Sequence, residues 1–291
     1  LAQIDTLDIP LTIKLIREFS DLGFGSIDIE EEYGGMEMDK VTSMLTTESI
    51  ANGQSASWAI SFGAHVGIGT LPIAIFGNKE QKQRYLPQMA TAEKIGAYCL
   101  TEPSSGSDAL AAKTTAVLSE DGKHYILNGT KQFITNGAFA DIFTVFAKVN
   151  GEDFTGFIVE RDFEGVSNGA EEHKMGLKGS STTTVNLDNV KVPIENLLWK
   201  QGKGHEIAFN ILNLGRLKLG IGNLGGCKTS INEALKYAEE RKQFGRDISQ
   251  FDMIKSKFAD MMIQTYALDS LGYNAIGKVQ ENIDRLDKDA E

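Results

Sequence analysis

The sequence predicts an α+β multidomain protein in which a small β domain lies between two helical domains. Apolar residues recur at three- to four-residue spacing in the first and last parts of the chain, whereas short runs of β-branched and aromatic residues fill the middle part. Three domains are therefore expected. They are an N-terminal α-helical domain over 1–94, a middle antiparallel β-sheet domain over 95–200, and a C-terminal helical bundle over 201–291 that we expect to be incomplete in this chain.

Three helices are expected in the N-terminal domain. The first carries apolar residues at helical spacing over 11–22. The second can begin at Asp39, and the third opens at Asn78, three residues before Gln81, which is the spacing of a capping box. The stretch 49–78 is uncharged and long enough to span a membrane, but its polar residues and glycines favour closely packed buried helices, so no transmembrane segment is expected.

The middle domain is expected to contain short strands separated by turns. The runs that predict strands are 113–118, 124–127, 142–149, 155–159 and 182–187. Asp121-Gly122 separates the first two runs, and this dipeptide is typical of a hairpin turn. The hairpin signal favours an antiparallel sheet.

The C-terminal part is expected to contain a very long helix, a break near Arg241–Gly245, and a second helix over about 252–277. Gly220–Gly225 matches the spacing of a dinucleotide-binding loop, but that loop requires a strand before it and a helix opening at it. Here the glycines lie inside a predicted helix. They are more consistent with a neighbouring helix or ligand that approaches the backbone closely.

Composition excludes several classes of function. The 40 acidic and 29 basic residues give a net charge of −11, which has the wrong sign for binding nucleic acid. The two cysteines cannot form a disulfide framework, and neither they nor the four histidines have metal-ligand spacing, so no metal site is expected. The chain begins without a methionine, and we expect it to be a segment of a longer protein.

Two segments have the composition of a ligand site. Tyr98–Asp108 begins as a strand and continues into a loop of proline, serine and glycine, which offers backbone amides and hydroxyls to a polar, partly anionic ligand. Lys131–Gly137 places Phe133 and Thr135 two residues apart, on one face of a strand, where a flat ring can be stacked and hydrogen-bonded. Taken alone, the first segment is better explained as an ordinary polar turn, because loops of serine and glycine are common. The second segment could also be an ordinary core strand.

Further motifs follow in a characteristic order. They are Lys174-Met175-Gly176, Ser180-Ser181-Thr182, Asn213-Leu214-Gly215-Arg216 and Glu240–Gly245. Together with the two earlier segments, they resemble the acyl-CoA dehydrogenase family of flavoproteins over essentially the whole chain. The chain is most similar to the long- and very-long-chain branch, through TEPSSGSD at Thr101–Asp108 and ADIFTVFAK at Ala140–Lys148.

The resemblance implies that the protein binds FAD and an acyl-CoA thioester. The residues implied to bind FAD are Tyr98, Leu100, Thr101, Gly106, Ser107, Phe133, Ile134, Thr135, Arg241, Gln243 and Phe244. Those implied to bind substrate are Ser107, Asn213, Leu214, Gly215 and Arg216. Arg241 would contact the FAD pyrophosphate of a neighbouring subunit, which implies a homodimer or homotetramer. Taken alone, Arg241 is better explained by pairing with Glu239 or Glu240 near a helix C-terminus, and only the full set of motifs favours the pyrophosphate contact.

The implied activity is α,β-dehydrogenation of long- or very-long-chain fatty acyl-CoA to trans-2-enoyl-CoA in fatty-acid β-oxidation, with electrons passing to an electron-transferring flavoprotein. The family uses a glutamate base, either directly before the arginine matched by Arg216, where this chain has Gly215, or in a late loop of the bundle. No catalytic residue is therefore assigned in this chain, and the base is expected beyond Glu291. The alternatives are a non-catalytic scaffold or partner subunit with the same fold, and an acyl-CoA oxidase. A cytoplasmic location is preferred over the mitochondrial matrix, which a eukaryotic source would imply.

Overall fold

The computed structural model describes residues 2–53 and 55–290, with side chains described up to residue 285. The chain divides into two compact units, which are treated separately below. Unit 1 comprises Leu1–Met38 and Ser55–Gly215, and unit 2 comprises Asp39–Gln54 and Arg216–Glu291.

Unit 1 begins with short and medium helices. They are α1 (Ala2–Asp5), α2 (Ile9–Asp21), η1 (Glu31–Tyr33), α4 (Ala56–Gly63), η2 (Ala64–Gly69), α5 (Leu71–Phe76) and α6 (Lys79–Ala90). The predicted capping box opens α6, because Asn78 accepts a hydrogen bond from the Gln81 amide (2.8 Å) and the Gln81 side chain accepts one from the Asn78 amide (3.0 Å). The first and third expected helices are thus confirmed as α2 and α6.

The uncharged stretch forms α4, η2 and α5 in succession, with a π-helical turn in the middle. By length and mean hydropathy (1.6) Ala56–Phe76 passes the test for a membrane span, yet 56% of the tested window is buried inside the protein. Close packing accounts for Gly69, where an added Cβ atom would lie 2.7 Å from the Gly96 carbonyl carbon, but not for Gly63 and Gly67, where nothing lies within 4 Å. The stretch therefore has the properties of a core helix.

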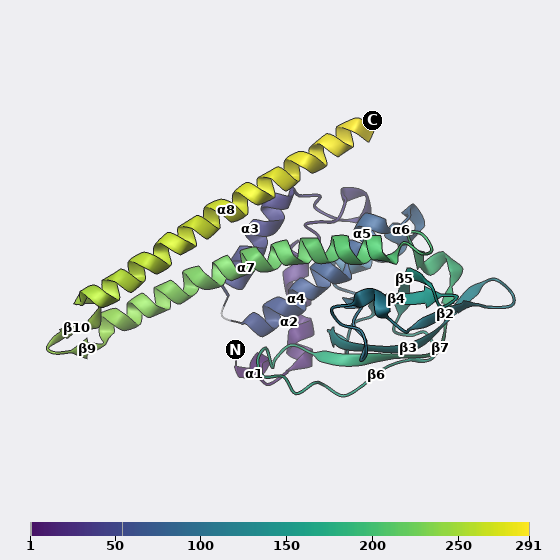
Figure 1. The fold of residues 1–291 in the computed structure, drawn as a ribbon, viewed down its shortest axis with the longest axis horizontal. Helices are drawn as coiled ribbons and strands as arrows, with labels where there is room; N and C mark the ends of the chain where they lie inside the picture. The colour runs from purple at the N-terminus through teal and green to yellow at the C-terminus, as the bar shows by residue number, and fades with distance from the viewer. Residues whose placement is uncertain (1, 54, 291) are drawn as a thin grey trace. The chain divides into compact units, whose positions relative to one another are not determined.

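The β-sheet of unit 1 has eight strands among the described residues. They are β1 (Gly96–Cys99), β2 (Thr115–Leu118), β3 (His124–Thr135), β4 (Ile142–Val149), β5 (Asp153–Glu160), β6 (Val166–Asn168), β7 (Thr182–Pro193) and β8 (Leu197–Leu198). The order along the sheet is β6-β7-β3-β2-β4-β5-β8, and β1 also pairs with β4 (Figure 1). Short 3₁₀ turns, η3 (Ala109–Ala111) and η4 (Ile194–Asn196), complete this part.

The sheet is mixed rather than wholly antiparallel. The predicted hairpin at Asp121-Gly122 is present, with Leu118 opposite Tyr125 in an antiparallel pair. However, β1 and β2 both pair with β4 in parallel. A turn dipeptide predicts that the two strands it joins are antiparallel. The strands β1 and β4 are instead separated in sequence by β2 and β3, so no local signal predicts how they pair.

Aromatic side chains fill the core between the sheet and the first part of α7 (Gly204–Glu240) that belongs to unit 1. Phe146 is fully buried and contacts the rings of Tyr98 (centroids 5.2 Å apart) and Phe154 (5.3 Å). Ile207 and Ile211 of α7 belong to the same buried cluster. Burying a phenylalanine contributes roughly 1.5–3 kcal/mol, so this core holds β1 firmly at the start of the first candidate segment.

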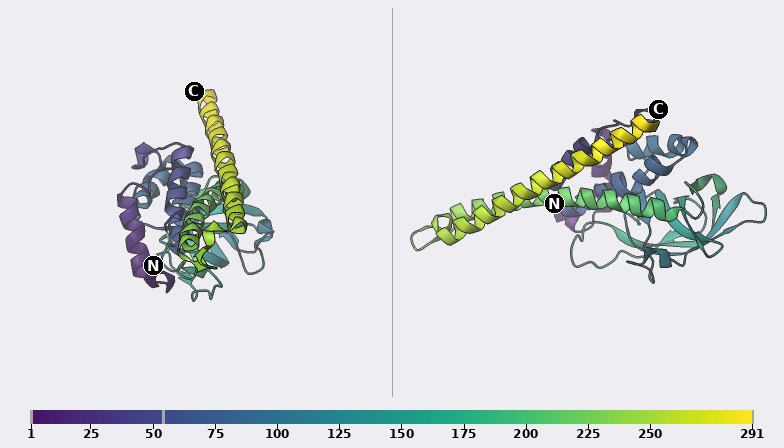
Figure 2. Two further views of the ribbon diagram at one scale, coloured as in Figure 1. Left: turned by 90° about the vertical axis from the view of Figure 1, so that its left-hand side faces the viewer. Right: turned by 45° about the horizontal axis from the view of Figure 1, so that its top comes forward.

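Unit 2 contains α3 (Lys40–Ala51), the rest of α7, the hairpin β9 (Lys242–Gln243) and β10 (Arg246–Asp247), η5 (Ile248–Gln250) and α8 (Asp252–Ala290). Asp39 caps α3 as predicted, accepting from the Thr42 amide (2.7 Å). The hairpin reverses the chain, and α8 begins beside the end of α7 (Figures 1 and 2). Gly225 confirms the close-approach interpretation, because a Cβ atom there would lie 2.6 Å from the Glu48 carbonyl oxygen.

Candidate active site

The first candidate segment is β1 and the loop after it. Tyr98 and Leu100 have buried side chains, and the Tyr98 hydroxyl donates to the Ala208 carbonyl (3.3 Å), so both offer mainly backbone atoms to a ligand. Burial raises the pKa of Tyr98. Thr101 is half-buried, while Gly106 and Ser107 are exposed beyond it. The segment therefore presents one hydroxyl at its base and another at its rim.

The second candidate segment is the end of β3, where the strand contains a bulge. The pairing with β7 shifts between Lys131 and Ile134, and Phe133 has a φ of +59°, a left-handed value that is uncommon for an aromatic residue. Ile134 is buried, whereas Phe133 is 57% exposed and Thr135 is half-buried. The bulge thus interrupts the regular alternation assumed from the sequence, yet Phe133 and Thr135 both remain outside the core.

The structure brings these two segments together. The Gln132 amide donates to the Thr101 carbonyl (2.8 Å), and the Lys131 ammonium lies 3.4 Å from the Leu100 carbonyl oxygen. The half-buried Thr101 therefore lies beside the strand that carries the exposed Phe133 ring. Two segments about 30 positions apart in the sequence are therefore adjacent in the fold.

A buried charged pair lies at this junction, and the sequence motifs predict no role for it. Lys131 donates to Glu102 (2.7 Å), and both side chains are almost completely buried. Burial lowers the pKa of Lys131, although Glu102 opposes this effect. Burial alone would raise the pKa of Glu102, but Lys131 and hydrogen bonds from Thr114 and the Lys113 amide lower it overall. Both residues occur in the quoted motifs, but no spacing rule pairs them.

Of the expected substrate residues, Ser107 lies in the loop after β1, and the other four lie in succession on α7. Asn213, Leu214 and Gly215 belong to unit 1, and Arg216 is the first residue of the adjoining part of unit 2. A Cβ atom added at Gly215 would lie 3.6 Å from the Ile68 side chain, which is an ordinary contact distance. Asn213 and Arg216 are three residues apart, so their side chains lie on the same side of the helix.

The remaining expected cofactor residues lie in unit 2, at the β9–β10 hairpin. Arg241 follows the last residue of α7, and Gln243 pairs with Arg246 across the hairpin. Phe244 is 93% exposed, with a φ of +52°, and its ring contacts Phe251 edge to face. Arg241 and Gln243 are also exposed. All three side chains are therefore accessible to a ligand.

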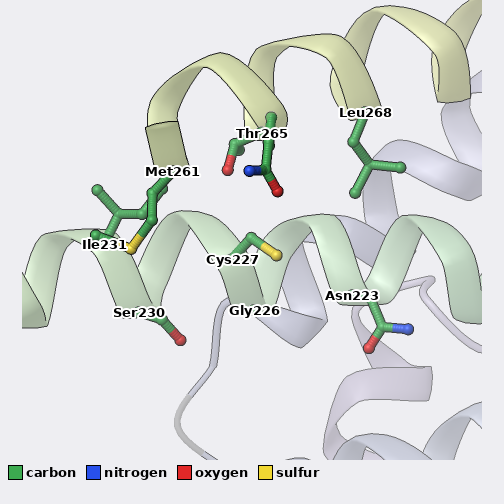
Figure 3. Close-up of a pocket in the computed structure, with 9 residues that line it drawn as sticks. Asn223, Gly226, Cys227, Ser230, Ile231, Met261, Thr265 and Leu268 are labelled. Carbon is green, nitrogen blue, oxygen red and sulfur yellow. The ribbon is translucent and has the colours of Figure 1, made fainter. Parts of the chain in front are cut away.

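Unit 2 also contains an open cavity of about 680 Å³ between α7 and α8 (Figure 3). Cys227 and Asn223 of α7 and Met261, Thr265 and Leu268 of α8 line it. None of the residues expected to bind cofactor or substrate is in its lining. The cavity is therefore separate from the candidate site.

His65 is the most perturbed histidine among the described residues. Its Nδ1 accepts from the Gly96 amide and its Nε2 donates to the Met89 carbonyl, each at 3.1 Å. Burial lowers its pKa to about 4, and the bond to Met89 partly opposes that effect. His65 therefore joins η2 to the first residue of β1 as a neutral ring. In the described part of the chain, no three His, Cys, Asp or Glu side chains form a cluster able to hold a metal ion.

Comparison with known protein families gives three matches that together span nearly the whole chain. The acyl-CoA dehydrogenase N-terminal domain matches residues 2–93, the middle domain matches 97–190, and the C-terminal domain matches 202–290. The protein belongs to the acyl-CoA dehydrogenase family. This result confirms the family resemblance and the predicted succession of helical, β and helical parts.

Individual relatives agree with this assignment. A probable acyl-CoA dehydrogenase of Bacillus subtilis is 52% identical over 94% of this chain and 46% of its own length. The mitochondrial very long-chain specific acyl-CoA dehydrogenase of Macaca fascicularis is 41% identical over 90% and 42%, and the short-chain specific enzyme of Clostridium acetobutylicum is 38% identical over 89% and 69%. The crystal structure of an acyl-CoA dehydrogenase complexed with FAD from Bacillus anthracis superposes with a TM-score of 0.95, at 50% identity over 97% of this chain and 49% of that chain. The chain thus spans about half the length of the first relatives that it matches.

Proposed function

We propose that the protein is an FAD-dependent dehydrogenase of acyl-CoA thioesters. The observation that carries this proposal is the junction of the two candidate segments, where the Gln132 amide meets the Thr101 carbonyl beside the exposed Phe133 ring. The Phe133 ring is exposed at a strand bulge with a left-handed φ of +59°, and it lies next to hydroxyl and backbone groups. The donor set therefore fits a flat, polar ring system such as that of FAD.

Each expected residue has a distinct part in holding the cofactor. The Phe133 ring would cover one face of the flavin, and the Thr101 and Thr135 hydroxyls would hydrogen-bond to its polar edge. Tyr98, Leu100 and Ile134 would contribute backbone atoms, because their side chains are buried. Arg241 of a neighbouring subunit would pair with the pyrophosphate, with Gln243 and Phe244 beside it. When bound, FAD supplies the hydride acceptor for the dehydrogenation.

The substrate would lie along α7. Ser107, exposed at the rim of the first segment, and the Asn213–Arg216 stretch would hold the thioester and the CoA moiety. Their role is alignment, because the reacting bond must be placed between the flavin and a base. Position 215 is a glycine and supplies no base, so we place the glutamate base in a part of the protein outside these 291 residues. The half-length match to the relatives supports this placement.

The finer assignments are also proposals. We propose a preference for long- or very-long-chain substrates, electron transfer to an electron-transferring flavoprotein, a homodimeric or homotetrameric assembly, a cytoplasmic location, and domain limits of 1–94, 95–200 and 201–291. Sequence identity does not decide the preferred length of the acyl chain, since a very-long-chain and a short-chain relative are 41% and 38% identical to this protein. The preference instead rests on the motifs at Thr101–Asp108 and Ala140–Lys148.

The flavin spectrum of the complete purified gene product tests the proposal. We expect a bound flavin that is bleached anaerobically by palmitoyl-CoA, and more slowly by butyryl-CoA. A flavin that no acyl-CoA bleaches would favour the scaffold alternative, and rapid reoxidation of the bleached flavin by oxygen would favour an oxidase. A protein without flavin would contradict the assignment of the site. Phe133→Ala is the matched variant, and we expect it to bind FAD on the order of 10-fold more weakly because the stacking surface is lost.

A further inference from the structure

The buried pair of Lys131 and Glu102 is unusually well satisfied. Glu102 Oε1 accepts from Lys131 Nζ (2.7 Å), the Thr114 hydroxyl (2.6 Å) and the Thr114 amide (3.1 Å), and Oε2 accepts from the Lys113 amide (2.6 Å). The Lys131 side chain is 0% exposed and that of Glu102 is 4% exposed. The carboxylate therefore has four donors in a region from which water is excluded.

Stability alone does not explain such a pair. Removing two charges from water costs several kcal/mol per ion, and well-packed apolar residues often stabilise a core equally well. Lys131 is among the largest completely buried side chains of the described residues. The position of the pair in the fold therefore needs another explanation.

The pair lies where the two candidate flavin segments join. Glu102 directly follows Thr101, and Lys131 lies two residues before Phe133. Lys131 Nζ also approaches the Leu100 carbonyl oxygen (3.4 Å). Reciprocal backbone hydrogen bonds between Glu102 and Ser105 (2.9 and 3.1 Å) close the turn that leads to Gly106 and Ser107. One ion pair thus fixes the base of the loop and the start of the bulge together.

We propose that Lys131 and Glu102 are positioning residues, which hold the Leu100–Ser107 loop and the Phe133 bulge in their FAD-binding arrangement before the cofactor binds. Pre-arranged segments lose less conformational entropy on binding, so the pair contributes to cofactor affinity. The inference rests on the proposed function, because it concerns the same site.

The test is a double variant that removes both charges, Lys131→Met with Glu102→Gln, made in the full chain. We expect the deflavinated variant to fold, because no unpaired charge is left in the core, but to bind FAD on the order of 10-fold more weakly by fluorescence titration, a difference of about 1.4 kcal/mol. The near-ultraviolet circular dichroism of the bound flavin should also change. The matched control is Lys82→Met with Glu30→Gln. It removes a 2.8 Å ion pair between α6 and the residue before η1, outside the candidate segments.

The outcomes separate the two proposals. If the wild-type protein binds FAD and the double variant binds it with the same affinity, the positioning role is overturned but the proposed function is not. Equal weakening in the control pair overturns it as well, because FAD affinity would then follow general stability. Wild-type protein that binds no FAD overturns both proposals. If the double variant does not fold, Thr114→Val keeps both charges and removes one donor to Glu102, and we expect about 3-fold weaker binding; unchanged affinity in that variant contradicts the inference.

Discussion

Each unit of the molecule contains a lysine held by carboxylates, and the two lysines behave in opposite ways. In unit 1, Lys131 is fully buried and pairs with the buried Glu102. In unit 2, Lys228 is 40% exposed and donates to Glu48 (2.7 Å) and Asp269 (2.9 Å), so that it links α7 to α3 and α8. Burial lowers the pKa of Lys131, whereas the hydrogen bonds to Glu48 and Asp269 raise the pKa of Lys228.

The difference shows that the contribution of a lysine–carboxylate pair to stability depends on how deeply the pair is buried. In unit 2, Lys228 and Asp269 are partly exposed and keep part of their hydration, so their interaction is a modest gain, although Glu48 itself is buried. In the core, the charges have lost their hydration, and each one depends on its partner. The pair in unit 1 therefore fixes geometry, while the cluster in unit 2 adds a small amount of stability between helices.

The largest expected effect comes from leaving one buried charge without its partner. Lys131→Met alone should lower the free energy of unfolding by ~3–5 kcal/mol, because Glu102 then remains buried without a counter-charge. The additional Glu102→Gln substitution should restore much of that loss. Urea unfolding monitored by circular dichroism measures both values. Equal stability of the single and double variants would contradict the conclusion that a buried charge in unit 1 depends on its partner.

The buried, neutral side chain of His65 extends the comparison of buried and exposed groups. Burial lowers the pKa of His65 to about 4, compared with 6.5 for the free side chain. The unfolded chain then binds more protons than the folded chain below pH 6.5, so the stability that His65 contributes is present above that pH and is lost as the pH falls towards 4. We expect a loss of about 2 kcal/mol between pH 7 and pH 5. His65→Gln should remove this part of the pH dependence, and an unchanged profile in that variant would exclude His65 as its source.

The smallest effect is expected in unit 2. Lys228→Met should cost about 0.5–1 kcal/mol, because the lysine is partly exposed, and the loss should shrink in 1 M salt. Since the pKa of Lys228 is raised, its contribution is present below about pH 10.5 and is lost as the pH rises through the folded-state value. Tyr273→Phe, which removes the 2.5 Å bond to Glu48 but no charge, is the control. A salt-independent loss above 3 kcal/mol would place Lys228 in the same class as Lys131.

Local signals predicted the elements that local interactions determine. The capping box at Asn78, the cap at Asp39 and the strand 142–149 could be predicted because short-range hydrogen bonds and periodicity decide them. The second helix expected in the C-terminal part, α8, extends to Ala290, beyond the predicted 277, because no strong stop signal marks its end.

The features that escaped prediction depend on distant parts of the chain. Two of these features join segments separated by about 30 residues or more: the parallel pairing of β1 with β4, and the ion pair of Glu102 with Lys131. The third, the bulge at Phe133, depends on how β3 pairs with the distant strand β7. Motif order indicated which residues belong to the candidate site. It did not indicate that a buried charge pair lies between them, since pairing across the fold has no sequence period.

The π-helical turn at Ala64–Gly69 also sets the helical register of the residues around it. A π turn has one residue more than the α turn that it replaces, so it rotates the residues that follow it relative to those before it. Deleting a residue there would rotate one end of the helix against the other by about 100° and remove His65 from the Gly96 amide. The length of this single turn therefore decides whether the first residue of β1 has a hydrogen-bond acceptor.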